Sequence, residues 1–232
     1  YVKLYDAETN FDAYLLLDAS SSMRYGSGKH SKLEYAKFMA ASLAYLIIAQ
    51  RDSVGLAVFD SRLRSFVPPR GTQGMIATIE RKLQEAQPEP RSDVSGLLHE
   101  IAQRIKRRSF VMLFSDLFGS VDELIKGLDH VAFGGHNITV FHTLDPHELE
   151  LPFSGTCRFV GLEGEPEITT QPRRIHAAYM REVADFTTQV RRACERNHAD
   201  YVLVNTARPL EVVLSEYLLN RSRLAGAAAR QE

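Results

Sequence analysis

The stretch LLLDASSSMRYGSGKHSKLEYA, residues 15–36, reads as the end of a strand, a small polar loop and the start of a helix. Residues 13–17 (AYLLL) are apolar without polar alternation, which indicates a strand buried on both faces of a sheet. Residues 32–50 have helical spacing, and one side of this predicted helix carries Leu33, Ala36, Ala40, Leu43 and Ile47. A buried strand that leads through a loop into a helix is typical of α/β proteins.

The rest of the chain continues this alternation of strands and helices. We predict strands at 54–59, 64–67, 110–114, 138–142 and 201–204, of which 64–67 is a short edge strand paired with 54–59. We predict helices at 75–86, 94–107, 121–131, 173–196 and 209–220, and a small hairpin from TCRFVGL and EPEITT. The pattern favours an α/β fold with three αβα layers and a mostly parallel central sheet. We expect one domain over residues 1–223 and a flexible tail over 224–232.

Composition and charge argue against several classes of protein. The 232 residues are 44% hydrophobic and 25% charged, and the formal net charge of −1 predicts neither nucleic acid nor anionic membrane as a partner. The longest apolar run, residues 38–49, is too short to span a bilayer, which takes about 20 residues. Cys157 and Cys194 lack metal-site spacing and indicate free thiols in a reducing, cytoplasmic compartment. Because the chain opens with Tyr1, we expect it to be a fragment of a longer protein.

The GSGK segment is not a phosphate-binding loop. The pattern G-x-x-x-x-G-K-[ST] would need glycine where Met23 stands and a hydroxyl where His30 stands. A phosphatase with a nucleophilic Asp18 would need a second carboxylate two residues later, where the chain has Ser20. The G-x-S-x-G pattern of serine hydrolases does not occur in the sequence.

The residues just before GSGK have the pattern of a cation site. Asp18, Ser20 and Ser22 alternate along the loop that leaves the first strand, so their oxygens can converge on one point. One anionic and two neutral oxygens form a suitable partial shell for Mg²⁺, whereas Zn²⁺ would prefer His or Cys.

Two further loops bring oxygen ligands to the same predicted edge of the sheet. The strand at 110–114 runs into Ser115 and Asp116, and the loop RSDVSG offers Ser92 and Asp93 before a helix. Each of these residues alone is most simply a helix cap or turn former. The combination of three loops at the carboxyl ends of parallel strands favours a binding site.

These motifs resemble a known family of domains. LDASSSM resembles the D-x-S-x-S motif of von Willebrand factor A-like domains, which is the first element of their metal-ion-dependent adhesion site. FSDLFG resembles the third element of that site, an Asp from another loop, which implies that Asp116 is a ligand. The second element usually carries Thr; here the resemblance implies Ser92, and Thr72 in RGTQG is a rival.

Almost the whole chain also resembles the bacterial family called domain of unknown function 58 (DUF58). The resemblance rests on YVKLYDAETN, LDASSSMRYG, DSVGLAVFDS, LFSDLF, LDPHELELPF and the closing YLLNR. It implies a further N-terminal region before Tyr1 and an association with MoxR-type AAA+ ATPases in assembling other protein complexes.

Three readings of the site follow. In the first, the protein is not an enzyme, and a divalent ion, Mg²⁺ (or Mn²⁺ or Ca²⁺), is bound by five side chains: Asp18, Ser20, Ser22, Ser92 and Asp116. One position on the ion stays open for an Asp or Glu of a protein partner, and Met23, Tyr25 and Asp93 are further contacts with that partner. The ion is expected to bind weakly without that partner. In the second, the same metal orients water for hydrolysis of phosphate esters, with Asp93 or His30 as base. In the third, no metal binds and backbone amides satisfy Asp18.

Overall fold

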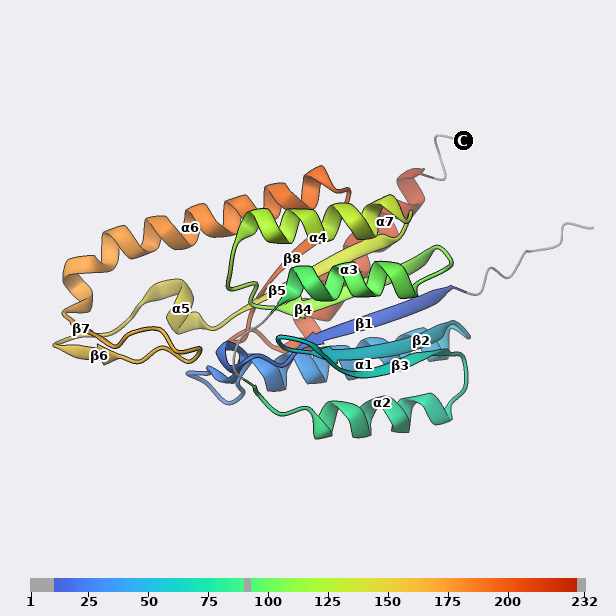
Figure 1. Ribbon diagram of the computed structural model, residues 1–232, viewed down its shortest axis with the longest axis horizontal. Helices are drawn as coiled ribbons and strands as arrows, with labels where there is room; N and C mark the ends of the chain where they lie inside the picture. Colours follow the sequence, from blue (N-terminus) through green and yellow to red (C-terminus); the bar gives the residue numbers. More distant parts are fainter. Residues whose placement is uncertain (1–10, 90–92, 229–232) are drawn as a thin grey trace, which may run out of the picture.

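The computed structural model describes residues 11–89 and 93–228, and its centre is a six-stranded sheet with the order β3-β2-β1-β4-β5-β8 (Figure 1). The strands are β1 Asp12–Asp18, β2 Ser53–Phe59, β3 Leu63–Arg70, β4 Ser109–Ser115, β5 Asn137–Leu144 and β8 Asp200–Asn205. Five of them are parallel, and β3 pairs antiparallel with β2 at one edge. The predicted α/β class, mostly parallel sheet and edge strand are therefore confirmed.

Helices cover both faces of the sheet (Figure 1). One face packs against α1 Lys32–Ala49, α2 Gly74–Glu85 and α7 Leu210–Ala228. The other packs against α3 Val94–Arg104, α4 Val121–Phe133 and α6 Pro172–Arg196. Alternate residues of β1 serve the two cores: Leu15 and Leu17 face the first group of helices, and Tyr14 and Leu16 the second. This double burial explains why β1 is a continuous apolar run.

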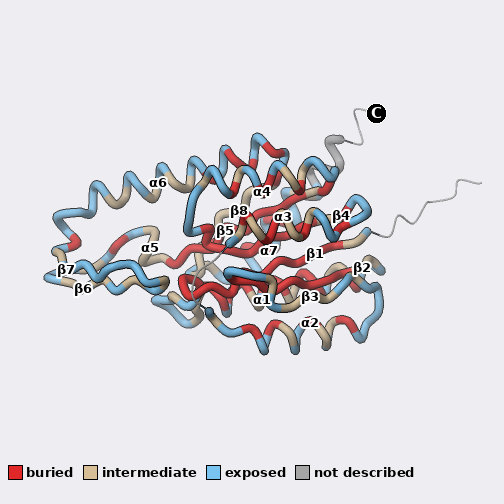
Figure 2. The backbone as a smooth tube through the Cα atoms, viewed as in Figure 1, coloured by how far each residue is buried: buried red, intermediate tan, exposed pale blue. Residues whose placement is uncertain are grey.

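A small arm extends beyond the carboxyl ends of the strands. It consists of α5 Pro146–Glu150, the predicted hairpin of β6 Cys157–Phe159 and β7 Ile168–Thr170, and the first turns of α6. Figure 2 shows that the hairpin and the first turns of α6 are largely exposed and α5 is partly buried, whereas most residues of the central strands are buried. The arm therefore projects from the edge of the sheet at which the site is predicted.

The ends of the helices differ slightly from the prediction. Helix α7 continues past the expected end at 220 and includes residues 224–228 of the expected tail. Helix α1 begins with a capping box, in which the Ser31 side chain accepts from the backbone of Glu34 while the Glu34 side chain accepts from Ser31. This cap fixes where α1 starts, and so places Lys32 at the edge of the sheet.

Candidate functional site

Four neighbouring parallel strands each end in a buried aspartate. The residues are Asp18 at the end of β1, Asp60 after β2, Asp116 after β4 and Asp145 after β5, and none is more than 1% exposed. Carboxyl ends of parallel strands meet at one edge, so the topology gathers these charges. Their partners differ, and the partners decide which of them can form a site.

The loop after β1 folds as predicted around its own hydroxyls. Asp18 Oδ1 accepts the backbone N–H of Ser20 at 2.9 Å, and the chain then turns into the short 3-10 helix η1 Ser21–Arg24. The hydroxyls of Ser20 and Ser22 lie 3.0 Å apart. Asp18, Ser20 and Ser22 are all buried, so three oxygen-bearing side chains meet in a small volume.

The loop after β4 approaches Asp18 from the neighbouring strand. Ser115 donates its hydroxyl to Asp18 Oδ2 at 2.6 Å and accepts the N–H of Leu117 at 2.9 Å. Leu117 has a φ of 57°, and this unusual left-handed turn directs the next N–H, that of Phe118, to Asp116 Oδ1 at 3.2 Å. Burial and the charge of Asp116 together raise the pKa of Asp18 to about 6. The structure therefore brings Asp18 and Asp116 together, as predicted.

Lys32 lies at this site and was not predicted there. Its ammonium Nζ lies 2.7 Å from Asp116 Oδ2 and 2.6 Å from Glu148 Oε1, and its side chain is wholly buried. Burial would lower the pKa of Lys32, but the charges of Asp116 and Glu148 outweigh it and raise that pKa. Lys32 therefore stays cationic and links α1, the β4 loop and α5. The sequence signal for it is weak, because the pairs span 84 and 116 residues.

The second predicted loop is described only at its two ends. The backbone N–H of Glu89 donates to Ala19, and Glu89 forms an isolated bridge with Ser20. The N–H of Asp93 donates to the carbonyl of Asp60 at 3.0 Å. Ser92 itself lies outside the described residues, but both flanks of its segment reach the site edge.

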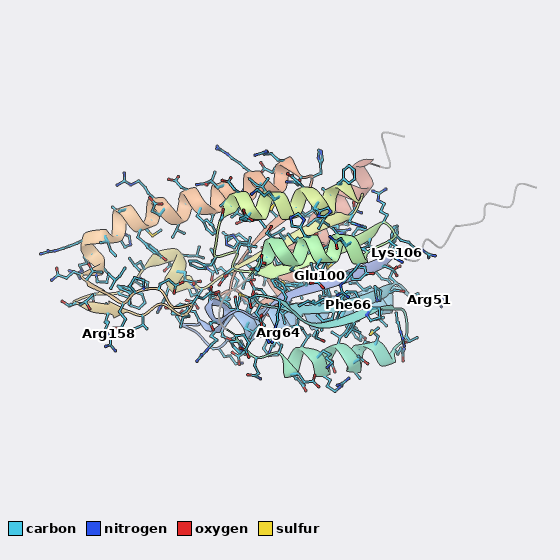
Figure 3. All side chains as sticks on the ribbon, viewed as in Figure 1. Arg51, Arg64, Phe66, Glu100, Lys106 and Arg158 are labelled. Carbon is cyan, nitrogen blue, oxygen red and sulfur yellow. The ribbon has the colours of Figure 1, made fainter. Side chains whose placement is uncertain are left out.

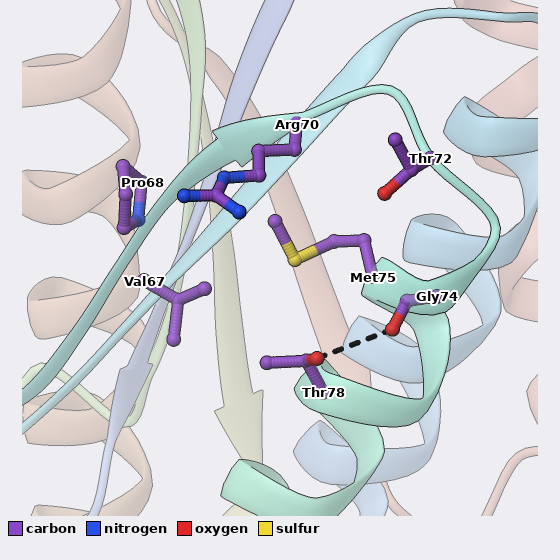
Figure 4. Close-up of a pocket in the computed structure, with 7 residues that line it drawn as sticks. All are labelled: Val67, Pro68, Arg70, Thr72, Gly74, Met75 and Thr78. Carbon is purple, nitrogen blue, oxygen red and sulfur yellow. Dashed lines mark hydrogen bonds between the residues drawn. The ribbon is translucent and has the colours of Figure 1, made fainter.

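The rival hydroxyl of Thr72 is at the wrong edge. Thr72 follows β3, whose Arg70 pairs with Val54 at the beginning of β2, the end opposite to Asp60. There it lines an open cavity of about 430 Å³ between β3 and α2 (Figure 4). The cavity is lined by Val67, Pro68, Arg70, Thr72, Gly74, Met75 and Thr78. The Thr72 alternative is therefore wrong.

The three predicted partner contacts have different surroundings. Met23 is completely buried in the core beside α1, so the prediction that it contacts a partner is wrong: its apolar side chain turns inward from η1. Tyr25 is half-buried, and Asp93 is exposed but caps α3 by accepting the N–H of Gly96 at 2.7 Å. Phe118 was not predicted; this residue, next to Asp116, is 57% exposed, and its ring centroid lies 5.4 Å from the Lys32 ammonium.

Two further residues brace the site. His142 donates from Nε2 to the carbonyl of Asp116 at 3.0 Å, and its Nδ1 accepts from the hydroxyl of Tyr201 at 2.9 Å. Burial lowers the pKa of His142 to about 4, so the ring is neutral and this tautomer is fixed. The strand-end aspartate after β2 differs from Asp18 and Asp116, because Asp60 pairs with Arg64 (labelled in Figure 3), which neutralises its charge.

The described residues fit a small oxygen-binding cation. Neighbouring ligands of an octahedral Mg²⁺ with bonds of ~2.1 Å lie ~3 Å apart, which matches the separation of the Ser20 and Ser22 hydroxyls. The net charge of the site is −2, from the carboxylates of Asp18, Asp116 and Glu148 and the ammonium of Lys32, and a divalent ion would neutralise it. Within residues 11–89 and 93–228, no three His, Cys, Asp or Glu side chains cluster as a metal site, so this donor set relies on hydroxyls.

Comparisons with known proteins agree with this architecture. A family model described as "Protein of unknown function DUF58" matches residues 1–189. The uncharacterized proteins Rv1480 of Mycobacterium tuberculosis and Mb1516 of Mycobacterium bovis are each 23% identical over 158 residues, 67% of this chain and 49% of theirs. The chain thus spans about half the length of these relatives.

Solved structures are similar to the chain in fold. The conserved hypothetical protein BatB from Bacteroides thetaiotaomicron has a TM-score of 0.62 at 15% identity, covering 94% of this chain and 100% of that one. The VWA domain of SpRpn10 has a TM-score of 0.50 at 12% identity, covering 89% and 95%. The fold is therefore von Willebrand factor A-like. No helix in the described part of the chain is long and apolar enough to cross a membrane.

Proposed function

Since this chain belongs to the DUF58 family, we propose that it is a protein-interaction module whose strand-end site binds a divalent cation and, through it, a carboxylate of a partner protein. The observation that carries the proposal is the meeting of Asp18, Ser20, Ser22 and Asp116 at one buried point. Two of these four are anionic and two are hydroxyls, which is the donor chemistry of Mg²⁺.

The ligands in this proposal are Asp18, Ser20 and Ser22, joined directly or through water by Ser92 and Asp116. Mg²⁺ is the expected ion, with Mn²⁺ or Ca²⁺ as substitutes, and when bound it would supply a position that attracts an incoming carboxylate. Ser115 and Ser20 hold the Asp18 carboxylate by hydrogen bonds from both of its sides. Lys32 holds Asp116 and offsets one negative charge when no ion is present.

The surface around the site suits a protein partner. Phe118 presents an exposed ring beside Asp116, and Tyr25 lies half-buried on the other loop, so a carboxylate at the ion would be flanked by aromatic surface. The family resemblance favours a MoxR-type AAA+ ATPase as the associated partner, acting in complex assembly in the cytoplasm. Phe118 replaces Met23 among the expected contacts, because Met23 is buried.

A binding role explains the surroundings of the site better than hydrolysis. Asp93 uses its carboxylate to cap α3, and the His30 ring packs edge-on against Phe38 at 5.1 Å between centroids. Each of these side chains is thus engaged away from the two strand-end aspartates of the site, Asp93 at the start of α3 and His30 against α1. We therefore propose that the module is not an enzyme.

Calorimetric titration tests this function. Mg²⁺ and Mn²⁺ are titrated into the wild type, Asp116→Ala and the control Asp129→Asn, which changes an exposed aspartate on α4. We expect saturable binding in the wild type and control and a loss of at least about tenfold in affinity in Asp116→Ala. Equal binding by all three proteins, or none by the wild type, would contradict the proposal.

A further inference from the structure

The hairpin of the arm reaches back to the site. The segment between β6 and β7 carries Glu163, whose Oε1 accepts the backbone N–H of Ser22 at 3.3 Å. The two residues are 141 positions apart in the sequence, and Ser22 is one of the proposed ion ligands. In Figure 1 the hairpin lies at the left of the sheet, and its connecting loop returns towards η1. A carboxylate of this chain thus already lies at the rim of the site.

The loop that carries Glu163 is built to hold a defined turn. Gly164 has a φ of 96°, a conformation that side chains rarely adopt. A Cβ on Gly161 would lie 2.3 Å from Oε2 of Glu165, so this glycine allows the Glu165 carboxylate to fold over the turn. That carboxylate accepts the N–H of Glu163 at 3.0 Å. The turn therefore directs the Glu163 side chain by contacts within the loop itself.

The base of the arm is also fixed to the β1 loop. Asp145, which caps α5, accepts both the N–H of Ser27 at 2.8 Å and its hydroxyl at 2.5 Å. Glu148 on α5 pairs with Lys32, and the Tyr179 hydroxyl of α6 donates to the Glu148 carbonyl at 2.7 Å. The base of the arm therefore has several contacts with the β1 loop and with α1 besides Glu163, and these can hold it in place when the Glu163 side chain moves.

We propose that Glu163 is an internal substitute for the partner carboxylate: the hairpin covers the site when no partner is bound, and the partner must displace it. This inference rests on the proposed function. Glu163 has the carboxylate chemistry expected of the partner, and it lies against a residue whose hydroxyl would bind the ion. Its contact with Ser22 is one long, partly buried hydrogen bond, which a competing carboxylate can replace.

Water relaxation by bound Mn²⁺ tests whether Glu163 covers the ion. The enhancement of water proton relaxation grows with the number of exchangeable waters on Mn²⁺, so it is measured for the wild type, Glu163→Gln and the control Glu167→Gln. Glu167 belongs to the same loop but pairs with Arg158, on the strand β6. We expect a higher enhancement per bound Mn²⁺ in Glu163→Gln, by about one added water, and the wild-type value in the control. Acetate should then lower the enhancement of Glu163→Gln at a severalfold lower concentration than in the wild type.

The outcomes separate this inference from the proposed function. Mn²⁺ binding that is abolished by Asp18→Ala, combined with equal relaxation in the wild type and Glu163→Gln, would overturn the role of Glu163 and leave the metal site standing. A wild type that binds no Mn²⁺ would overturn both. A second readout needs no metal: hydrogen exchange of the Ser22 amide should be at least threefold faster in Glu163→Ala than in Glu167→Gln. Equal exchange in the two variants would also count against the contact.

Discussion

Replacing Asp18 by Asn is expected to stabilise the protein in the absence of divalent ions. Asp18 is completely buried, and burial together with the charge of Asp116 raises its pKa from 3.8 to about 6. At pH 7 the folded state must therefore keep an ionised carboxylate where its charge is unfavourable. An amide of the same shape removes that charge, still accepts the Ser20 N–H and can donate to the hydroxyl of Ser115.

The size of the effect follows from the shift in pKa. One pKa unit corresponds to about 1.4 kcal/mol, so a shift of roughly two units disfavours the folded state by about 3 kcal/mol at pH 7. Part of the gain is lost because Ser115 must reorient its hydroxyl, so we expect about 2 kcal/mol. In a domain of this size that raises the midpoint of thermal unfolding by about 4–8 °C.

The pH dependence has a definite sign. A carboxyl group whose pKa is higher in the folded than in the unfolded state contributes its full stability below the unfolded pKa of 3.8, and that contribution is lost as the pH rises through about 6. The advantage of Asp18→Asn should therefore be largest at pH 7 and vanish near pH 4. Added Mg²⁺ should reverse the order of stability, because only the wild type would bind it.

Urea unfolding in EDTA at several pH values between 4 and 7 measures the difference. The control is Asp129→Asn, which removes an exposed carboxylate and should change the free energy of unfolding by less than about 0.5 kcal/mol. A variant Asp18→Asn that is no more stable than the wild type at pH 7 in EDTA, or equally advantaged at pH 4, would contradict the raised pKa of Asp18.

Two other predictions concern buried groups. Lys32→Met should destabilise the protein by about 3–5 kcal/mol in chemical denaturation, because Asp116 and Glu148 lose their shared cation. Adding Glu148→Gln should recover part of this loss, whereas wild-type stability of Lys32→Met would contradict the ion pairs. Burial raises the pKa of the Cys194 thiol to about 12. Ellman's reagent at pH 8 should therefore modify the partly exposed Cys157 quickly and Cys194 only on unfolding, and two thiols that react equally fast would contradict the fold.

The fold was predictable because its signals are local. Doubly buried strands such as β1 and β4 appear in the sequence as apolar runs, and the Pro88-Glu89-Pro90 segment separates two helical patterns. The strand-end rule also places Asp18 and Asp116 correctly. Side-chain orientation on a single helical turn is less predictable, which is why Met23 was expected to contact a partner and instead lies in the core.

The charges that complete the site could not be predicted from local pattern. Lys32 looks like an ordinary first residue of a helix, and Glu148 like an ordinary member of a capping box. Their pairing depends on how α1 and α5 are placed by the whole sheet. The same holds for Glu163, whose contact with Ser22 requires the hairpin to fold back over the chain. Ion pairs between residues far apart in the sequence leave no periodic pattern, so they cannot be predicted from the spacing of residues.

The edge strand β3 has a consequence for how this molecule meets others. Gly55 on β2 allows β3 to approach closely: a Cβ there would lie 2.6 Å from the carbonyl of Val67. Pro68 and Pro69 follow without N–H groups, and the pairing with β2 shifts register at both ends. An incoming strand would find an irregular and donor-poor border there. At high concentration, copies of this protein are therefore not expected to associate edge to edge through β3.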